Sequence, residues 1–190
     1  MTVGFYLDMT RCIGCRACQV VCKDKNRLDV GTIFRQAFSF SVGSFPNVRG
    51  YSYSASCNHC NAPACVENCP TGAMHKADDG TVVHDDAMCI GCATCTKECP
   101  YGIPRILPSG IAGKCDACQV RRAAGDNPVC VDACPNRALD FGEREDLLAR
   151  HGGDAESQIA VLPSADITGP NVLIHAKPAA HEASFAAVSW

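Results

Sequence analysis

The sequence predicts an α+β fold of two similar halves, one nested inside the other, with a β-hairpin insertion and an extended C-terminal tail. Three observations support this prediction. The chain has 16 cysteines in 190 residues, these cysteines form four groups of four, and two long segments contain none. Such a pattern indicates small repeated units that are held together by cross-links or metal rather than by a large apolar interior.

The composition excludes several classes of protein. Charged residues make up 19% of the chain, and apolar residues are common enough that a disordered protein is excluded. No run of 18 apolar residues is present, so we expect no direct membrane span. A net charge of −3 without a basic block argues against nucleic-acid binding. Asp8 interrupts the first residues where a signal peptide would be apolar, so we expect no export signal.

Sixteen cysteines have three competing uses. A disulfide scaffold is typical of a secreted chain shorter than about 100 residues that carries a signal peptide. Zinc favours isolated CxxC pairs, often with histidine as a further ligand. Iron–sulfur clusters take four thiolates each, which matches four groups of four. The spacing within the groups distinguishes these uses.

The first and third groups share the spacing CxxCxxCxxxC of bacterial ferredoxins. They are Cys12, Cys15, Cys18 and Cys22, and Cys89, Cys92, Cys95 and Cys99, the last followed by Pro100. Three thiolates two residues apart surround three corners of a cubane, and the fourth belongs to the neighbouring cluster. Both runs read CIGC, in which Gly14 and Gly91 stand where the backbone bends sharply.

The second and fourth groups are the same run with insertions between the second and third cysteines. They are Cys57, Cys60, Cys65 and Cys69, and Cys115, Cys118, Cys130 and Cys134. Each begins with CxxC and ends with CxxxCP. A CxxC pair alone would also suit zinc or a redox dithiol, but the two intact runs beside these groups favour [4Fe–4S] clusters.

Exchange of the fourth ligand pairs the groups. Groups two and three are close in sequence and are predicted to form one two-cluster half, which groups one and four enclose. The predicted ligand sets are Cys12, Cys15, Cys18 and Cys134 (cluster a), Cys22, Cys115, Cys118 and Cys130 (cluster b), Cys57, Cys60, Cys65 and Cys99 (cluster c), and Cys69, Cys89, Cys92 and Cys95 (cluster d). Pairing group one with two and three with four is the alternative that the residues leave open.

Over nearly its whole length the chain resembles the four-cluster iron–sulfur (B) subunits of molybdopterin oxidoreductases, in particular that of dimethyl-sulfoxide reductase. The resemblance rests on RCIGCRACQVVCK (residues 11–23), SCNHCNAPACVENCPTGAMHK (56–76), CIGCATCTKECPYG (89–102), KCDACQVR (114–121), CVDACPNRALDFG (130–142) and LPSADITGPNVLI (162–174). The family uses the nested pairing. Some relatives lack the second cysteine of group three and hold a three-iron cluster there; Cys92 implies four [4Fe–4S] clusters here.

The resemblance also implies the function. The chain would relay single electrons between a membrane anchor that oxidises quinol and a catalytic subunit that carries molybdopterin, and it would have no catalytic site of its own. The complex would be peripheral to the membrane, on the extracytoplasmic face after export with the catalytic subunit, with the cytoplasmic face as the alternative. Two other hypotheses are a polyferredoxin-type carrier or small subunit of a formate dehydrogenase or hydrogenase complex, and a zinc-stabilised interaction module.

The rest of the chain is assigned around the cysteine groups. Residues 1–22 with 103–142 form the outer half, 57–102 the inner half, 23–56 the insertion, and 143–190 a short helix followed by the tail. Strands are expected at 4–8 and 138–142, which could pair, and at 73–76 and 81–84, which flank the turn signal Asp78-Asp79-Gly80. A helix is expected at 143–150, acidic early and basic late, before Gly152.

Two segments have two interpretations each. Alternating aromatic residues in 23–56 predict a hairpin with one apolar face, which covers the protein's own core or binds a partner. The Ala/Pro/Ser-rich tail is either partly disordered or lies along a partner subunit.

Few other residues suggest chemistry. His59 lies between two cysteines, but four thiolates complete the set, so we expect it to pack beside the cluster. The remaining histidines share no spacing. Five cations lie near ligands and either raise a cluster's potential or are solvated: Lys23, Lys97, Lys114, Arg121 and Arg122.

Overall fold

The structure is a computed structural model that describes residues 2–188. Its strands are β1 (Val3–Asp8), β2 (Gln36–Val42), β3 (Arg49–Ala55), β4 (Met74–Lys76), β5 (Val82–His84), β6 (Arg105–Ile106), β7 (Ala112–Gly113), β8 (Leu139–Glu143), β9 (Leu173–His175) and β10 (Phe185–Val188). Its α-helices are α1 (Ala17–Lys25), α2 (Ala64–Glu67), α3 (Thr94–Glu98), α4 (Gln119–Ala123), α5 (Val129–Asp132) and α6 (Arg144–His151). Two 3-10 helices are η1 (Ala165–Ile167) and η2 (Pro178–His181).

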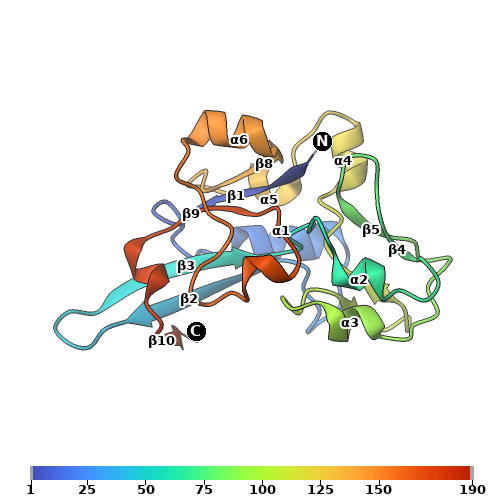
Figure 1. The fold of residues 1–190 in the computed structure, drawn as a ribbon, viewed down its shortest axis with the longest axis horizontal. Coiled ribbons are helices and arrows are strands. Elements are labelled where there is room, and N and C mark those ends of the chain that lie inside the picture. The colour runs from blue at the N-terminus through green and yellow to red at the C-terminus, as the bar shows by residue number, and fades with distance from the viewer. Residues whose placement is uncertain (1, 189–190) are drawn as a thin grey trace.

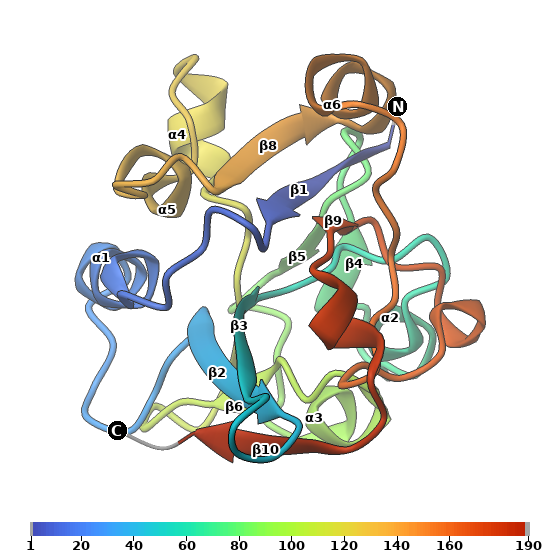
Figure 2. The same ribbon diagram turned by 90° about the vertical axis from the view of Figure 1, so that its left-hand side faces the viewer.

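The first sheet joins the two ends of the chain. Strand β1 lies between β8, which runs antiparallel to it, and β9, which runs parallel (Figure 2). Phe5 of β1 pairs with Phe141 of β8, and their rings meet edge to face at 4.8 Å. The predicted pairing of strands at 4–8 and 138–142 is thus confirmed. Helix α6 packs on this sheet through the fully buried Leu147, and it matches the helix predicted at 143–150.

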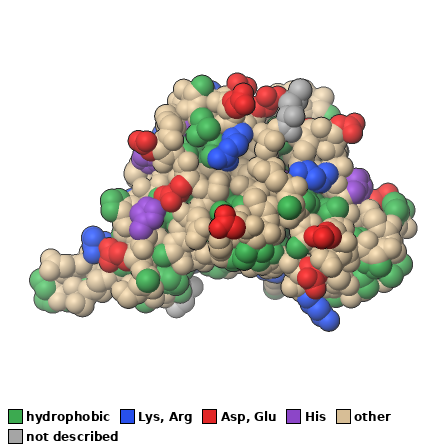
Figure 3. Space-filling model, in the orientation of Figure 1, with side chains coloured by type: hydrophobic (Ala, Val, Ile, Leu, Met, Phe, Trp, Pro, Cys, Tyr) green, Lys and Arg blue, Asp and Glu red, His purple; other side chains and the backbone are tan. Residues whose placement is uncertain are grey.

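The second sheet has the order β10–β2–β3, all antiparallel. Alternation of serine and tyrosine places Tyr51 and Tyr53 on one face of β3, where each is 3% exposed, and both faces of the strand are buried at this point. The ring of Phe40 stacks on Tyr51 at 5.2 Å and meets Phe185 of β10 at 5.6 Å. The protein's own tail therefore covers part of the aromatic face. The far end of the β2–β3 pair projects at the lower left of the molecule (Figures 1 and 3).

The β4–β5 hairpin has the position predicted for it, with Met74 opposite His84. Asp79 holds its turn by accepting hydrogen bonds from the amide and hydroxyl of Thr81 at 2.9 and 2.6 Å, and it meets Arg122 at 2.5 Å. Burial opposes ionisation of Asp79, but these contacts prevail and lower its pKa to about 2. The ion pair joins the β4–β5 turn to α4.

The C-terminal segment differs from the extended tail that was expected. It adds β9 to the first sheet and β10 to the second, and Val172, Leu173 and Ile174 are at most 5% exposed. The reason is that β1 and β2 each have a free edge that another strand can cover. The short apolar run 172–174 becomes buried when it pairs with the edge of β1. Contact of the tail with a partner stays a prediction.

The molecule places α2, α3 and the β4–β5 hairpin at one side and the two three-stranded sheets at the other (Figure 1). Among residues 2–188, no helix combines the length and the apolar character that crossing a bilayer requires.

Candidate iron–sulfur centres

The sixteen cysteines are all free thiols, and they gather into four sets, which we call cages. The sets are cage a (Cys12, Cys15, Cys18, Cys134), cage b (Cys22, Cys115, Cys118, Cys130), cage c (Cys57, Cys60, Cys65, Cys99) and cage d (Cys69, Cys89, Cys92, Cys95). Cages a, c and d each surround a cavity that all four of their cysteines line. In cage b, the thiol of Cys22 lies within electrostatic range of the other three.

All four loops share one backbone feature. The residue directly before the second cysteine has a positive φ in every run: Gly14 (69°), His59 (45°), Gly91 (67°) and Ala117 (53°). At Gly14 a Cβ atom would lie 2.6 Å from the Ser52 hydroxyl, and at Gly91 it would lie 2.2 Å from the Gly110 carbonyl. Backbone therefore excludes a side chain at Gly91, whereas at Gly14 the positive φ and two neighbouring serine hydroxyls favour glycine. In the other two loops a left-handed conformation is imposed on His59 and Ala117, as occurs at functional sites.

Short helices carry the polypeptide from one cage to the next. Helix α1 contains a cysteine of cage a and one of cage b, four residues apart, so it spans both cages. Helices α5, α2 and α3 each contain the third cysteine of their run and are followed by its fourth, which belongs to another cage. Helix α1 packs on α5, and α2 packs on α3. The structure thus brings group one to group four and group two to group three.

Hydrogen bonds surround the sulfur atoms. Backbone amides of Ala138 and Met74 approach Cys134 and Cys69 at 3.2 and 3.4 Å. Four side-chain hydroxyls also lie within reach of sulfur: Thr168 Oγ1 at 3.2 Å from Cys60, Ser54 Oγ at 3.3 Å from Cys18, Thr94 Oγ1 at 3.4 Å from Cys92 and Thr71 Oγ1 at 3.9 Å from Cys69. Donors of this kind stabilise thiolate and sulfide charge.

The cages differ in how far their cysteines are exposed to solvent. Every cysteine of cage b is buried, as are three of the four in cage c. Cages a and d each have one exposed cysteine, Cys15 and Cys92. The isoleucines beside these two, Ile13 and Ile90, are 67% and 68% exposed. Cages a and d thus reach the surface, whereas cages b and c are more deeply buried.

The buried thiols are neutral unless a cation replaces their protons. Burial raises the pKa of Cys22 to about 12, and repulsion from Cys115 adds to this effect. Burial likewise raises the pKa of Cys65 to about 12, with repulsion from Cys57 adding to it. These thiols bind as thiolates only when bound iron supplies positive charge in place of the protons.

The arrangement of four thiols around one cavity fits a polynuclear centre. This arrangement suits a cluster, because each thiolate then binds a different iron atom. The donor set, composed of sulfur alone, also agrees with iron–sulfur chemistry.

Two buried cations lie among the cages. Arg35 is 1% exposed and interacts with Cys130, Cys115, Cys18 and Cys22. Lys114 is 6% exposed, donates to the carbonyls of Val82 and Cys115, and lies within range of Cys65. Lys114 was among the cations considered from the sequence, whereas Arg35 was missed because no cysteine is near it in the chain.

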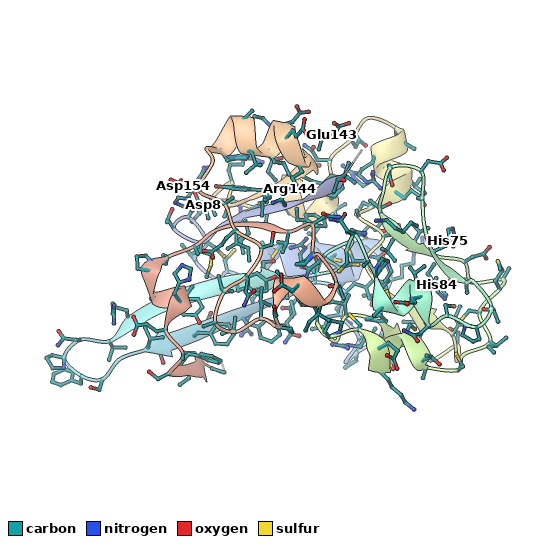
Figure 4. The ribbon with its side chains drawn as sticks, in the orientation of Figure 1. Asp8, His75, His84, Glu143, Arg144 and Asp154 are labelled. Carbon is teal, nitrogen blue, oxygen red and sulfur yellow. The ribbon has the colours of Figure 1, made fainter. Side chains whose placement is uncertain are left out.

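Two histidines, His59 and His84, lie beside the cages. His59 is fully buried, and its Nδ1 accepts from the amide of Val82 at 3.0 Å, which agrees with the packing role expected for it. Burial, with Lys114 nearby, holds the pKa of His59 well below its usual value, so it is neutral. His84, to which the sequence assigned no chemistry, lines cage d. It lies with His75 on the β4–β5 hairpin, across the molecule from Asp8 (Figure 4).

The C-terminal segment clamps the loop of cage c. Asn171 donates through Nδ2 to the carbonyl of His59 at 2.7 Å and to Asn61 Oδ1 at 3.0 Å. Thr168, 2% exposed, supplies the hydroxyl near Cys60. These contacts span more than 100 positions of the chain. The only sequence signal for them was that residues 162–174 shared a motif with the family.

Comparisons with known proteins agree with this site. A family model described as a 4Fe-4S dicluster domain matches residues 48–144, and a 4Fe-4S binding domain matches residues 9–26. Together the two ranges contain all sixteen cysteines.

Three relatives show the extent of the similarity. The B subunit of the anaerobic dimethyl sulfoxide reductase of Escherichia coli is 44% identical over 180 residues, which cover 90% of this chain and 87% of that protein. The subunit of the same name from Haemophilus influenzae is 42% identical over 181 residues, with the same coverage, 90% and 87%. The iron–sulfur subunit of a Shewanella arsenate respiratory reductase is 31% identical over 196 residues, covering 77% of this chain and 83% of the relative.

Proposed function

The protein belongs to the family of iron–sulfur electron-transfer subunits that includes the B subunit of anaerobic dimethyl sulfoxide reductase, and on that premise we propose how it conducts electrons. When bound, each [4Fe–4S] cluster accepts one electron and passes it on. The role of the polypeptide is to set the spacing, exclude water and tune the potentials. The order of the four cages, with exposed cages only at the two ends, carries the proposal.

We propose that each cage ligates one cluster, so that clusters a to d have the ligands of cages a to d. Support comes from the three lined cavities, from the raised thiol pKa values and from the absence of disulfides among residues 2–188. The same pairing divides the protein into an outer half (1–22 with 103–142) and an inner half (57–102). The packing of α1 on α5 and of α2 on α3 supports this nested division.

The contacts between cages support the linear order a, b, c, d. Cages a and b are joined by α1, and Cys18 lies within electrostatic range of Cys130. Cages b and c approach through Cys115 and Cys57. Cages c and d are joined by α2 and α3. An electron that enters at one exposed cage would thus cross two enclosed cages before it leaves at the other.

The two exposed ends suit two different partners. We propose that cage a faces a catalytic subunit that carries molybdopterin and that cage d faces a membrane anchor with a quinol site. The names of the relatives, which describe single chains or subunits of reductases, support assembly with other chains. The complex would then be peripheral to the membrane on the extracytoplasmic face, after export together with the catalytic subunit.

The test separates electron relay from catalysis in the assembled complex. Cys118→Ser removes a ligand from the enclosed cage b, so quinol-dependent reduction of dimethyl sulfoxide in anaerobic membranes should fall at least about tenfold. Reduction of the same substrate by a viologen dye, which can reach the catalytic subunit directly, should be retained. Cys118→Ser membranes with undiminished quinol-dependent turnover would refute the relay. The absence of a molybdenum-containing partner on purification would refute the proposed complex.

A further inference from the structure

Arg35 carries a positive charge at the junction of cages a and b, in a place where a charge is costly. It lies just before β2, and its side chain is 1% exposed. Removing a guanidinium from water without a partner of opposite charge destabilises a protein strongly. None of the ion pairs formed among residues 2–188 includes Arg35. The ring of Phe5, 4.3 Å from the guanidinium carbon, supplies only a cation–π contact.

Two of the three guanidinium nitrogens of Arg35 lack hydrogen-bond acceptors among the described residues. Its Nη1 donates to the carbonyl of Ser54 at 3.3 Å and to Ser54 Oγ at 3.0 Å. Its Nε and Nη2 are buried and have no partner among the described residues. An arginine has five N–H donors and no acceptor capacity, so these donors need anionic or lone-pair partners.

Four cysteine thiols lie within electrostatic range of the same side chain. The thiols that interact with Arg35 are Cys130, Cys115 and Cys22 of cage b and Cys18 of cage a. A guanidinium remains protonated even when it is buried, so Arg35 brings a fixed positive charge to this place. Because Nη1 donates to Ser54 Oγ, the Ser54 hydroxyl hydrogen is free to donate to Cys18, 3.3 Å away.

We propose that Arg35 is an electrostatic bridge between clusters a and b, which donates through Nε and Nη2 to sulfur of cluster b and through Ser54 to Cys18, and thereby raises both reduction potentials. The inference rests on the ligand sets proposed above. An oxidised [4Fe–4S] cluster with four thiolates carries a charge of −2 and a reduced one −3, so a fixed cation favours the reduced state. The insertion between groups one and two would then tune the first two steps of the relay.

The position of Arg35 should confine its effect on reduction potential to clusters a and b. Lys114 occupies the equivalent place between cages b and c, where it contacts Cys115 and lies near Cys65. Cage d has no cysteine among the strongest interactions of Arg35. Loss of Arg35 should therefore lower the potentials of clusters a and b while it leaves those of c and d in place.

The experiment is a redox titration of the anaerobically purified complex, followed by electron paramagnetic resonance. Signals are first assigned with Cys15→Ser for cluster a and Cys118→Ser for cluster b. In Arg35→Gln, the reduction equilibrium constants of clusters a and b should each fall about tenfold, or 59 mV for a one-electron couple. Arg35→Lys, which keeps the charge, should restore most of the shift. Arg49→Gln, an exposed arginine of the adjoining β3, is the matched control and should shift none of the four.

The outcomes are distinct. Unchanged potentials in Arg35→Gln, or an equal shift of all four clusters, would overturn the role of Arg35. If Arg35→Gln fails to retain iron, Ser54→Ala decides, because it keeps the guanidinium and removes only the hydroxyl. It should lower the equilibrium constant of cluster a alone by about twofold to threefold, and no shift would overturn the bridge. A wild-type protein without four clusters would overturn the proposed function itself.

Discussion

The hydroxyl of Thr168 gives a quantitative test of how the C-terminal segment acts on cluster c. Thr168→Val keeps the shape of a side chain that is 2% exposed and removes only the donor 3.2 Å from Cys60. A net hydrogen bond contributes about 0.5–1.5 kcal/mol. The more negative reduced cluster gains most from it, so the potential of cluster c should fall by about 20–60 mV.

A second threonine provides the control. Thr94 Oγ1 lies 3.4 Å from Cys92, and this sulfur is exposed. Water can replace the hydroxyl lost in Thr94→Val, so cluster d should shift by less than about 10 mV. Both potentials are read from the same type of anaerobic redox titration. The reasoning is wrong if cluster c does not shift, shifts upward, or shifts no more than cluster d does in Thr94→Val.

Four further outcomes are expected. Iron analysis of the anaerobic protein should give about 16 Fe per chain, and a count near 15 with a three-iron signal would contradict four intact cubanes. Cys134→Ser should alter the spectrum of cluster a; altering a cluster bound by Cys115 instead would contradict the pairing. Leu173→Ala, at a fully buried site, should lower the free energy of unfolding by about 2–4 kcal/mol and speed hydrogen exchange in β9. The control Ile167→Ala, at a site 58% exposed, should change the free energy of unfolding by under about 0.5 kcal/mol. Asp79→Ala should lower the free energy of unfolding, measured in urea, by about 1 kcal/mol at pH 7. Because the pKa of this carboxylate is depressed to about 2, the difference from the wild type should shrink as the pH falls from about 4 towards 2. An equal difference at pH 3 and pH 7 would contradict this expectation.

The sequence predicted those elements whose cause is local. The turn signal at residues 78–80 gave the β4–β5 hairpin, and the charge pattern with Gly152 gave α6. The regular spacing of the cysteines predicted their chemistry, because the geometry of a cubane restricts the lengths of the loops that can surround it.

The features that the sequence did not predict depend on contacts between distant segments. Thr168 lies 108 positions from Cys60, so no local pattern marks it as a donor. The tail looked structureless because its composition lacks a clear period, whereas its order comes from the free edges of β1 and β2. Nothing in the sequence around Arg35 indicates that this arginine is buried, because its burial depends on the tertiary fold.

The central place of β1 in its sheet has a consequence for biosynthesis. Both neighbours of β1 come late in the sequence, β8 at residues 139–143 and β9 at residues 173–175. The first strand therefore has no partner strand until some 130 residues after it have been synthesised, with the thiols of residues 12–22 beside it. Residues 57–102 contain both partners of their helix pair and can close much earlier. Maturation should thus run from the interior of the sequence outward, and the earliest cysteines to be translated should be among the last to receive iron.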